Sequence, residues 1–551
     1  MAFVMNNLFA GRRNLLKLSG LGLAGAAATT LPLMADQTGG NDAKPPLNLV
    51  DVRMFGAKGD GKTVDTPAIN KAIEIVASAG GGVVFFPAGT YLCFSIHLRS
   101  QVELRLSIGS VILAADSPLP GQTTGYNGGT YDSAESNTTW DPYQDYGHNH
   151  WHNSLLWGED LHDVSITGPG LIYGRGLSFG GDSHPRGDYP IYIAEQAGVG
   201  NKSIALKNCR NVLFRDFSIL KGGHFGLLLT GVDNLTIDNL KIDTDRDGID
   251  IDCCKNVRVS NCTVNSPWDD GICPKSSFAL GYARATENVT ITNCLVTGCY
   301  QLGTVLDGTF KKFESQNQAH YTGRIKCGTE SNGGFKNITI SNCVFEGCQG
   351  LALETVDGAL LEDIAITNIT MRDIVSCPLF LRLGARLRGP KESTSVGTLR
   401  RVVISNLECY NSASKFSSIL SGIPGYAIED VKLSNIYIQH QGGATADAAS
   451  IQPPEFIDKY PEPGMFGPTP VHGFYLRHLR HLEMSHVEVQ PMSPDARPAF
   501  HLEDVNRADF IAVTAPGSKP AFALNHVTDL RILLSRAAKD TVLAAANNQM
   551  V

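Results

Sequence analysis

The sequence is short of charged residues and has few long apolar runs, and both shortages narrow the classes of protein it can be. Asp, Glu, Lys and Arg make up only 18 % of its 551 residues, and the formal net charge is −8. A net negative charge argues against nucleic acid as a partner, because binding it needs a broadly basic surface. An anionic substrate would therefore need locally placed Arg and Lys. After residue 33, no stretch is apolar for long enough to cross a membrane.

The first 35 residues have the pattern of an export signal. Arg12 and Arg13 precede a mildly apolar run, rich in Gly and Ala, from residue 18 to residue 33. This order is typical of a twin-arginine signal peptide. We expect residues 1–35 to be removed on export, residues 36–47 to be a linker, and the product to be a monomer in the periplasm or secreted, without membrane contact. The alternative is a chance Arg pair in a membrane anchor.

A short helix is expected near the start of the mature chain. Asp65 or Thr66 can cap it, and Pro67 suits its first turn. The apolar residues that follow recur at helical spacing: they are Ile69, Ala72, Ile73 and Val76. One amphipathic helix ahead of a long chain of strands suits a cap over the open end of a stack.

From about residue 160 the sequence repeats a short pattern. Apolar residues fill positions 0, +2, +5 and +7, and Asn fills position +4 in most copies. The copies begin at Val212, Leu235, Val257, Val289, Ile338, Ile364, Val402, Val431 and Leu482. Alternation at 0 and +2 indicates a strand with one face inside, and Asn tolerates the left-handed backbone of a bend. The pattern predicts an all-β parallel β-helix, one domain over residues 48–551, with stacked Asn side chains.

The thirteen cysteines would first suggest disulfides in an exported protein. Cys262, Cys294 and Cys343 nevertheless occupy position +5 of the repeat, which other copies fill with Phe, Leu, Ile or Val. We interpret them as small core residues rather than ligands or disulfide partners.

Polar and charged residues collect at one corner of four successive coils, just before a Gly that opens the second strand of the coil. The corner holds His224, then Asp247, then Asp269 and Asp270, then Gln301. Carboxylates this close together repel one another, and the repulsion raises the pKa of one of them. A turn with a purely structural role would gain nothing from such an arrangement. A glycosidase uses such a set, because one acid protonates the leaving group while another activates water. The corner is therefore the predicted working groove.

Residues 122–157 interrupt the repeat and are rich in aromatic residues. Tyr126, Tyr131, Trp140, Tyr143, Tyr146 and Trp151 belong to this insertion. They suit either a wall on which sugar rings stack or a surface loop held by its own aromatic residues. His148, His150 and His152 alternate and could face one side to hold a metal, although no acidic or Cys partner stands at a fixed spacing.

Taken together, these motifs resemble glycoside hydrolase family 28, the polygalacturonases. The resemblance rests on residues 55–61 and 81–91 near the start, on the coil repeat, on the intact pair Asp269-Asp270 and on the intact triplet Arg324-Ile325-Lys326. Two motifs depart from the family. Its Asn-Thr-Asp is here Asp245-Arg246-Asp247, and its Gly-His-Gly corresponds to residues 300–303, which lack the His.

The resemblance implies a right-handed, pectin-lyase-like parallel β-helix that hydrolyses α-linked uronic-acid polymers by inversion, without metal or other cofactor. It implies that Asp269 is the general acid and that Asp247 and Asp270 position and activate water. It also implies that Arg324 and Lys326 bind the substrate carboxylate. Residues two apart on a strand face one side, and Arg and Lys both suit a uronate, so the spacing agrees with that last role.

His224 and Gln301 are further substrate-binding candidates, with a structural corner His as the alternative for His224. Asp250 and Asp252 are expected to be surface carboxylates, and Asp270 is expected to raise the pKa of Asp269. Stacked strands are about 4.8 Å apart, whereas inversion usually needs carboxyl groups about 6.5–9.5 Å apart.

The altered motifs leave the substrate open, with rhamnogalacturonan as an alternative. A polysaccharide lyase and a non-catalytic glycan-binding β-helix remain the competing classes of protein.

Overall fold

The computed structural model describes residues 49–145, 147–178, 194–312, 321–413 and 415–551, without the side chain of Gln301. The expected signal peptide, the expected linker and Tyr146 lie outside these ranges. Residues Pro46–Val551 form one compact unit. Among the described residues, no helix combines the length and the apolar character needed to cross a membrane.

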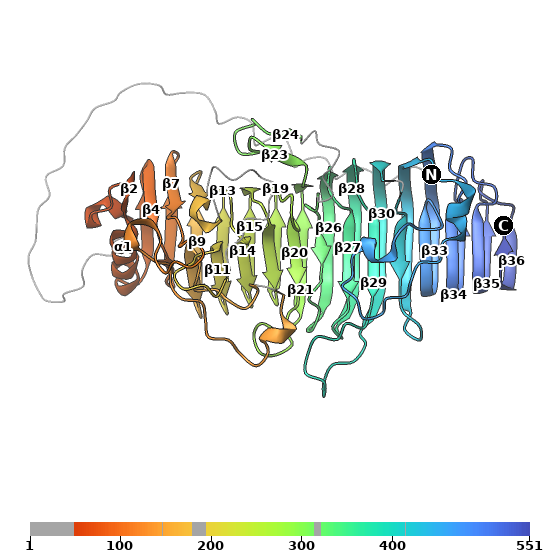
Figure 1. Cartoon of the computed structure of the whole chain (residues 1–551), viewed down its shortest axis with the longest axis horizontal. Helices are drawn as coiled ribbons and strands as arrows, with labels where there is room; N and C mark the ends of the chain where they lie inside the picture. Colours follow the sequence, from red (N-terminus) through yellow and green to blue (C-terminus); the bar gives the residue numbers. More distant parts are fainter. Residues whose placement is uncertain (1–48, 146, 179–193, 313–320, 414) are drawn as a thin grey trace, which may run out of the picture. The chain divides into compact units, whose positions relative to one another are not determined.

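Successive coils stack through parallel strand pairs on three faces, as the repeat predicts (Figure 1). The first face carries the predicted corner. Its strands are β5 (Ile96–His97), β8 (Leu156–Glu159), β11 (Lys202–Lys207), β14 (Phe225–Thr230), β17 (Asp247–Asp252), β20 (Ile272–Lys275), β25 (Lys326–Cys327), β27 (Leu351–Thr355), β29 (Leu379–Leu383) and β31 (Ser418–Ser421). An isolated parallel bridge between Ile272 and Ile325 continues the face from β20 towards β25.

The other two faces carry the repeat itself. The second face consists of β1 (Leu49–Asp51), β3 (Gly82–Phe86), β6 (Val102–Leu106), β9 (His162–Thr167), β12 (Arg210–Arg215), β15 (Asp233–Asp238), β18 (Lys255–Ser260) and β21 (Thr286–Thr292). The third consists of β2 (Asp60–Val64), β4 (Gly89–Cys93), β7 (Ser110–Ala114), β10 (Leu171–Tyr173), β13 (Ser218–Leu220), β16 (Lys241–Asp243), β19 (Thr263–Asn265) and β22 (Leu295–Thr297).

In the later coils one long strand passes through the bend and serves both of these faces. These strands are β26 (Phe335–Glu346), β28 (Leu360–Arg372), β30 (Thr398–Ser412) and β32 (Ile428–Gly442). They are followed by β33 (Phe474–Ser493), β34 (Phe500–Ile511) and β35 (Phe522–Leu533). Phe510 and Leu530 are buried in these last coils, so the stack continues beyond Val489.

Asn residues shape the bends. Asn261, Asn293 and Asn342, all at position +4, have φ of 58°, 56° and 54°, the left-handed region that Asn tolerates. Their side chains stack as expected, with Asn368 donating to Asn342 (3.0 Å) and Asn406 donating to Asn368 (3.2 Å). A second ladder, which the repeat analysis missed although it stands one residue before position 0, runs through Asn211, Asn234, Asn256, Asn288 and Asn337.

The cysteines belong to the core. All thirteen are buried and free, and Cys262, Cys294 and Cys343 are at most 2 % exposed. Their expected role as small apolar residues is confirmed.

Both ends of the stack are closed by elements that do not repeat. Helix α1 (Thr66–Ser78) packs its four expected apolar residues into the core at the N-terminal end (Figure 1). The side chain of Asp65 does not cap the helix, contrary to expectation, because it accepts the backbone N–H groups of Lys58 (2.7 Å) and Gly59 (2.9 Å). At the other end, β36 (Thr541–Ala546) and β37 (Gln549–Met550) pair antiparallel to β35 and cover its edge.

Replacing Asn368 tests the contribution of the ladder to stability. Asn368→Ala should lower the free energy of unfolding by about 1–3 kcal/mol, because Ala loses the two hydrogen bonds of the ladder and is strained at a φ of 55°. Asn368→Gly should cost less, since Gly adopts this φ without strain. Denaturant unfolding measures both, and equal losses for Ala and Gly would show that backbone strain has no part in the effect.

Candidate active site

Parallel register brings the three predicted acids together. Asp247 begins β17 and pairs with Phe225 of β14, while Asp269 and Asp270 lie in the turn just before β20, which pairs with β17. One carboxylate oxygen from each of the three acids lies within 4.8 Å of the others. Asp247 and Asp270 are buried, and Asp269 keeps 21 % of its side chain exposed.

Each acid faces a cation. Lys275 of β20 lies 2.7 Å from Asp250 and 3.7 Å from Asp247. Lys326 of β25 lies 2.5 Å from Asp270. The guanidinium of Arg246 pairs with Asp269. Nothing in the sequence pattern marked Lys275 as part of the site, although it pairs in register with Asp252 and points to the same side of the sheet.

These surroundings separate the protonation states of the acids. Burial raises the pKa of Asp247, and the negative charges of Asp250 and Asp269 raise it further. Burial also acts to raise the pKa of Asp269, but Arg246 and the nearby lysines outweigh it, so this pKa is lowered. The pKa of Asp270 is lowered too, because Lys326 and Arg324 outweigh its burial. The expected rise at Asp269 is therefore wrong, and the reason is its ion pair with Arg246.

Arg324 and Lys326 face one side of the strand, while Ile325 and Cys327 are buried in the core. Arg324 already has three partners: its Nε donates to Asp270 (2.8 Å), one Nη donates to Gln349 (2.6 Å), and the other pairs with Glu462 (2.5 Å). It is 1 % exposed. The structure thus places both residues at the acids, with Arg324 held by protein groups.

The structure describes the side chain of His224, one of the two further substrate-binding candidates, but not that of Gln301. His224 is 1 % exposed and stacks on Phe225, with ring centroids 4.3 Å apart. Its Nε2 lies 2.9 Å from an Nη of Arg246. Burial and the charge of Arg246 lower the pKa of His224, so the neutral ring accepts a hydrogen bond there. Gln301 lies in β23 (Tyr300–Leu302), and its side chain is outside the described set.

Asp250 and Asp252 are not surface carboxylates, contrary to expectation. They are 0 % and 1 % exposed. Asp250 pairs with Lys275, and Asp252 accepts hydrogen bonds from the backbone N–H (2.8 Å) and the hydroxyl (2.6 Å) of Ser277. Both lie under loops that the repeat pattern does not encode.

The three alternating histidines of the insertion have different nearest acids, although His150 and His152 both lie within 4 Å of Glu135. His148 pairs with Glu330 and lies 3.3 Å from Lys275, His150 lies 3.4 Å from Glu195, and His152 lies 3.1 Å from Glu159. They do not form one metal site together. The described residues bring donor atoms close enough for a metal in four other sets: His148, His224 and Asp247; Asp145, His148 and Glu330; Asp247, Asp250 and Cys273; and the three acids of the corner.

Several aromatic residues of the insertion pack against the protein. Tyr131 and Trp151 are both 2 % exposed, and the indole of Trp151 donates to Thr230 (3.1 Å). Tyr143 packs edge-on against Phe278. Tyr131 and Trp151 thus hold the loop in place and cannot form a wall for sugar stacking.

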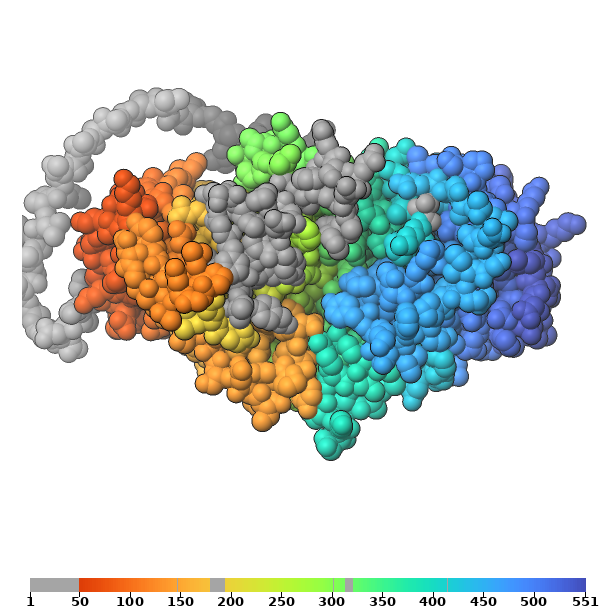
Figure 2. Space-filling view, in the orientation of Figure 1, coloured from red at the N-terminus to blue at the C-terminus, as the bar shows by residue number. Residues whose placement is uncertain are grey.

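Three loops meet over the outer side of this face. Asp145 of the insertion pairs with Arg388 (2.6 Å), which follows β29. Tyr460, between β32 and β33, shares a hydrogen bond with Thr329 (3.0 Å). In Figure 2 the insertion (orange), the segment after β29 (teal) and the segment before β33 (light blue) are neighbours on the viewed face. Contacts between residues this far apart in the chain bury the cations and acids of the corner.

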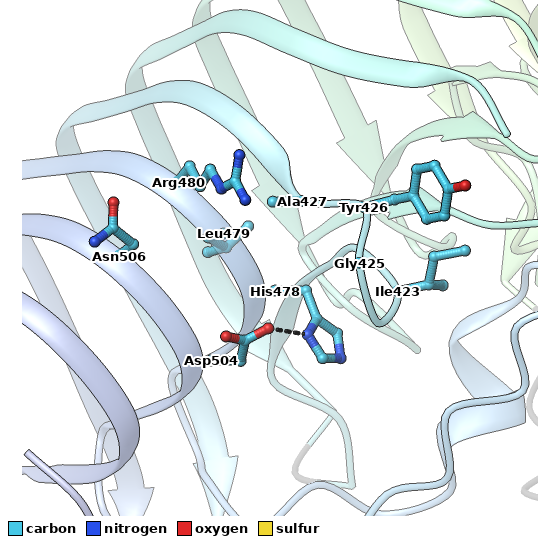
Figure 3. A pocket seen from close by; sticks show the side chains of 9 residues that line it. All are labelled: Ile423, Gly425, Tyr426, Ala427, His478, Leu479, Arg480, Asp504 and Asn506. Carbon is cyan, nitrogen blue, oxygen red and sulfur yellow. Dashed lines mark hydrogen bonds and ion pairs between the residues drawn. The ribbon is translucent and has the colours of Figure 1, made fainter.

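A separate hollow lies further towards the C-terminus, between the turn at Gly425 and the strands β33 and β34 (Figure 3). His478 and Asp504 form a hydrogen bond of 2.6 Å at its edge. It contains none of the predicted site residues.

Two family descriptions match parts of the chain. Residues 49–107 match "Rhamnogalacturonase A/epimerase, pectate lyase-like", and residues 191–280 match a right-handed β-helix region. A probable polygalacturonase from Vitis vinifera is 26 % identical over 304 residues, which are 49 % of this chain and 54 % of that protein. The chain thus spans about half the length of this curated relative.

Two solved structures share the fold. An exopolygalacturonase from Thermotoga maritima superimposes with a TM-score of 0.53 at 21 % identity, over 72 % of this chain and 88 % of that one. A family 28 exopolygalacturonase from Yersinia enterocolitica gives 0.55 at 18 % identity, over 88 % and 78 %. The right-handed parallel β-helix is confirmed, and so is the resemblance to the polygalacturonases.

Glu354 of β27 provides a test of the buried charges. It is fully buried, and burial raises its pKa to about 8 despite the nearby Lys326 and Arg324. A carboxyl whose pKa is raised on folding stabilises the fold fully below its unfolded pKa near 4.5 and loses that contribution as the pH rises through about 8. Glu354→Gln should therefore flatten the fall in stability between these pH values, as measured by thermal unfolding across the range. An unchanged pH dependence would contradict a protonated Glu354.

Proposed function

We propose that this chain is a glycoside hydrolase of the polygalacturonase type, acting on α-linked uronic acid in pectic or related acidic polysaccharide. The observation that carries the proposal is the convergence of Asp247, Asp269 and Asp270 within 4.8 Å, beside four cationic side chains, on one face of a parallel β-helix. The relative from Vitis vinifera, a probable polygalacturonase, supports the same chemistry.

The acids divide the work of hydrolysis between them. Asp270, whose pKa is lowered by Lys326 and Arg324 against its burial, is ionised and accepts a proton from water. Two oxygens within 4.8 Å can both hydrogen-bond one water, since two such bonds span about 5.4 Å. Asp247 and Asp270 therefore hold the attacking water between them, and Asp269, the most exposed of the three, faces the leaving oxygen.

We propose inversion for this reaction. One direct displacement by water needs no covalent sugar–enzyme intermediate, and none of the three acids is then required as a nucleophile. The short separation of the acids is compatible with inversion here because the water bridges two of them while the third serves the leaving group.

Product analysis tests the activity. Asp269→Asn should lower turnover of polygalacturonate by about 10²- to 10⁴-fold, the usual contribution of a general acid, while wild-type protein yields saturated oligosaccharides detectable by mass spectrometry. Proton NMR of the first-formed reducing ends should show the inverted anomer.

Asp216→Asn is the matched control, because Asp216 occupies a bend position that other coils fill with Asn, and it should leave turnover unchanged. Products lighter by one water would show a lyase, and retained anomers would contradict inversion. No product from polygalacturonate or rhamnogalacturonan would favour a glycan-binding protein.

We also propose export through the twin-arginine route to the periplasm or beyond. The Arg12-Arg13 pair ahead of the Gly- and Ala-rich run supports it. When the protein is expressed with its leader, it should be recovered outside the cytoplasm, with the mass of a chain that begins near residue 36. The double substitution Arg12→Lys, Arg13→Lys should keep it inside with an intact leader. Export of the double variant at the wild-type rate would contradict this route.

A further inference from the structure

Four cations surround the acids, and they differ in how accessible they are. The exposed fractions of the side chains are 1 % for Arg324, 4 % for Lys326, 6 % for Lys275 and 15 % for Arg246. Asp269, the partner of Arg246, is 21 % exposed, against 1 % for Asp270 and 3 % for Asp247. The pair of Arg246 and Asp269 is thus the part of the charged cluster that a ligand can reach.

Each of the three less accessible cations neutralises a buried carboxylate. Arg324 and Lys326 hold Asp270, and Lys275 holds Asp250. Arg324 also pairs with Glu462, whose side chain is 33 % exposed. Removing a cation from such a pair leaves a buried charge without compensation, which is strongly unfavourable. An incoming carboxylate would therefore have to compete with these pairs at a high energetic cost.

Arg246 is placed to exchange its partner. Its Nε and one Nη both donate to the same oxygen, Oδ2 of Asp269, and the other Nη donates to Nε2 of His224 at 2.9 Å. The neutral, buried ring of His224, stacked on Phe225, holds that third position. His224 is thus a positioning residue for Arg246. The Nε–Nη edge of a guanidinium fits the two oxygens of a carboxylate.

We propose that Arg246 is the receptor for the substrate's uronate carboxylate, which replaces Asp269 on the guanidinium and thereby frees Asp269 to act as the general acid. This inference rests on the proposed hydrolase function and deepens it. The residue that departs from the family's Asn-Thr-Asp motif then determines specificity, and Arg324 and Lys326 serve mainly to keep Asp270 ionised.

The exchange changes the charge balance at Asp269. The charged and titratable groups that act on it are Arg246, Asp247, Asp250, Asp270, Lys275, Lys326 and Tyr460. With Arg246 turned to the substrate, burial and the carboxylates dominate, so the pKa of Asp269 rises and it takes a proton from solvent. It gives this proton to the glycosidic oxygen as the anomeric C–O bond breaks, and water forms the new bond and gives its proton to Asp270.

The test compares an acidic substrate with its neutral counterpart. Wild-type protein should cleave a galacturonate oligomer roughly 10- to 100-fold more efficiently than the methyl-esterified oligomer, the range of a charge-assisted hydrogen bond. Arg246→Gln should raise KM for the acidic oligomer and abolish the preference, and Arg246→Lys should restore part of it. Arg258→Gln, an exposed Arg on β18, is the control and should change neither.

The pH dependence of kcat and of kcat/KM distinguishes a receptor role of Arg246 from a purely structural one, which would not change it. In wild-type protein the pKa of the acid should be lower in kcat/KM, which reports free enzyme, than in kcat, which reports the complex. In Arg246→Gln the two should coincide at the higher value. A variant that folds, keeps the preference for the acidic oligomer and keeps two separate pKa values would overturn the proposal.

Calorimetric titration with the galacturonate oligomer separates this inference from the proposed function. Binding that depends on Arg246, without turnover by wild-type protein, would contradict hydrolysis and support the receptor. Turnover with binding independent of Arg246 would contradict the receptor alone, and neither binding nor turnover would contradict both.

Discussion

The parallel register between neighbouring coils is the constraint on which the site depends. Because β14, β17 and β20 pair in parallel with matched positions, residues one coil apart in sequence become lateral neighbours in space. Charged residues at one corner of successive coils are therefore forced together whether or not their charges are compatible. The rest of the site compensates for that placement: cations from β20 and β25 neutralise the acids, and loops exclude water from most of them.

This arrangement separates groups that hold the site together from groups that can respond to a ligand. Asp270 with Arg324 and Lys326, and Asp250 with Lys275, are buried pairs, in which either partner alone would be costly. Asp269 and Arg246 retain contact with solvent. In the proposed mechanism the buried Asp270 is the base and the more accessible Asp269 is the acid, so that one cluster serves two tasks.

The features that could be predicted from the sequence are those that recur with the repeat. Position 0 and position +2 indicated the strands, Asn at +4 the bends, and the spacing from Asp247 to Asp269 their shared corner. The repeat could not reveal contacts made by loops, because Glu462 reaches Arg324 from 138 residues away and Asp145 reaches Glu330 from 185. The prediction of a raised pKa for Asp269 was wrong for a more local reason. It took account of the negative charge of Asp270 but not of the positive charge of Arg246, which lies one coil away.

The thirteen buried thiols affect whether unfolding of the protein is reversible. They lie between β4 and β30, so many coils in this part of the stack carry a thiol that solvent reaches only when the coil opens. In a repeat architecture, where each coil is stabilised mainly by its neighbours, local opening in an oxidising medium would let exposed thiols crosslink before the strands pair again. Unfolding there becomes irreversible, and the lifetime of the protein is then governed by the rate at which its weakest coil opens.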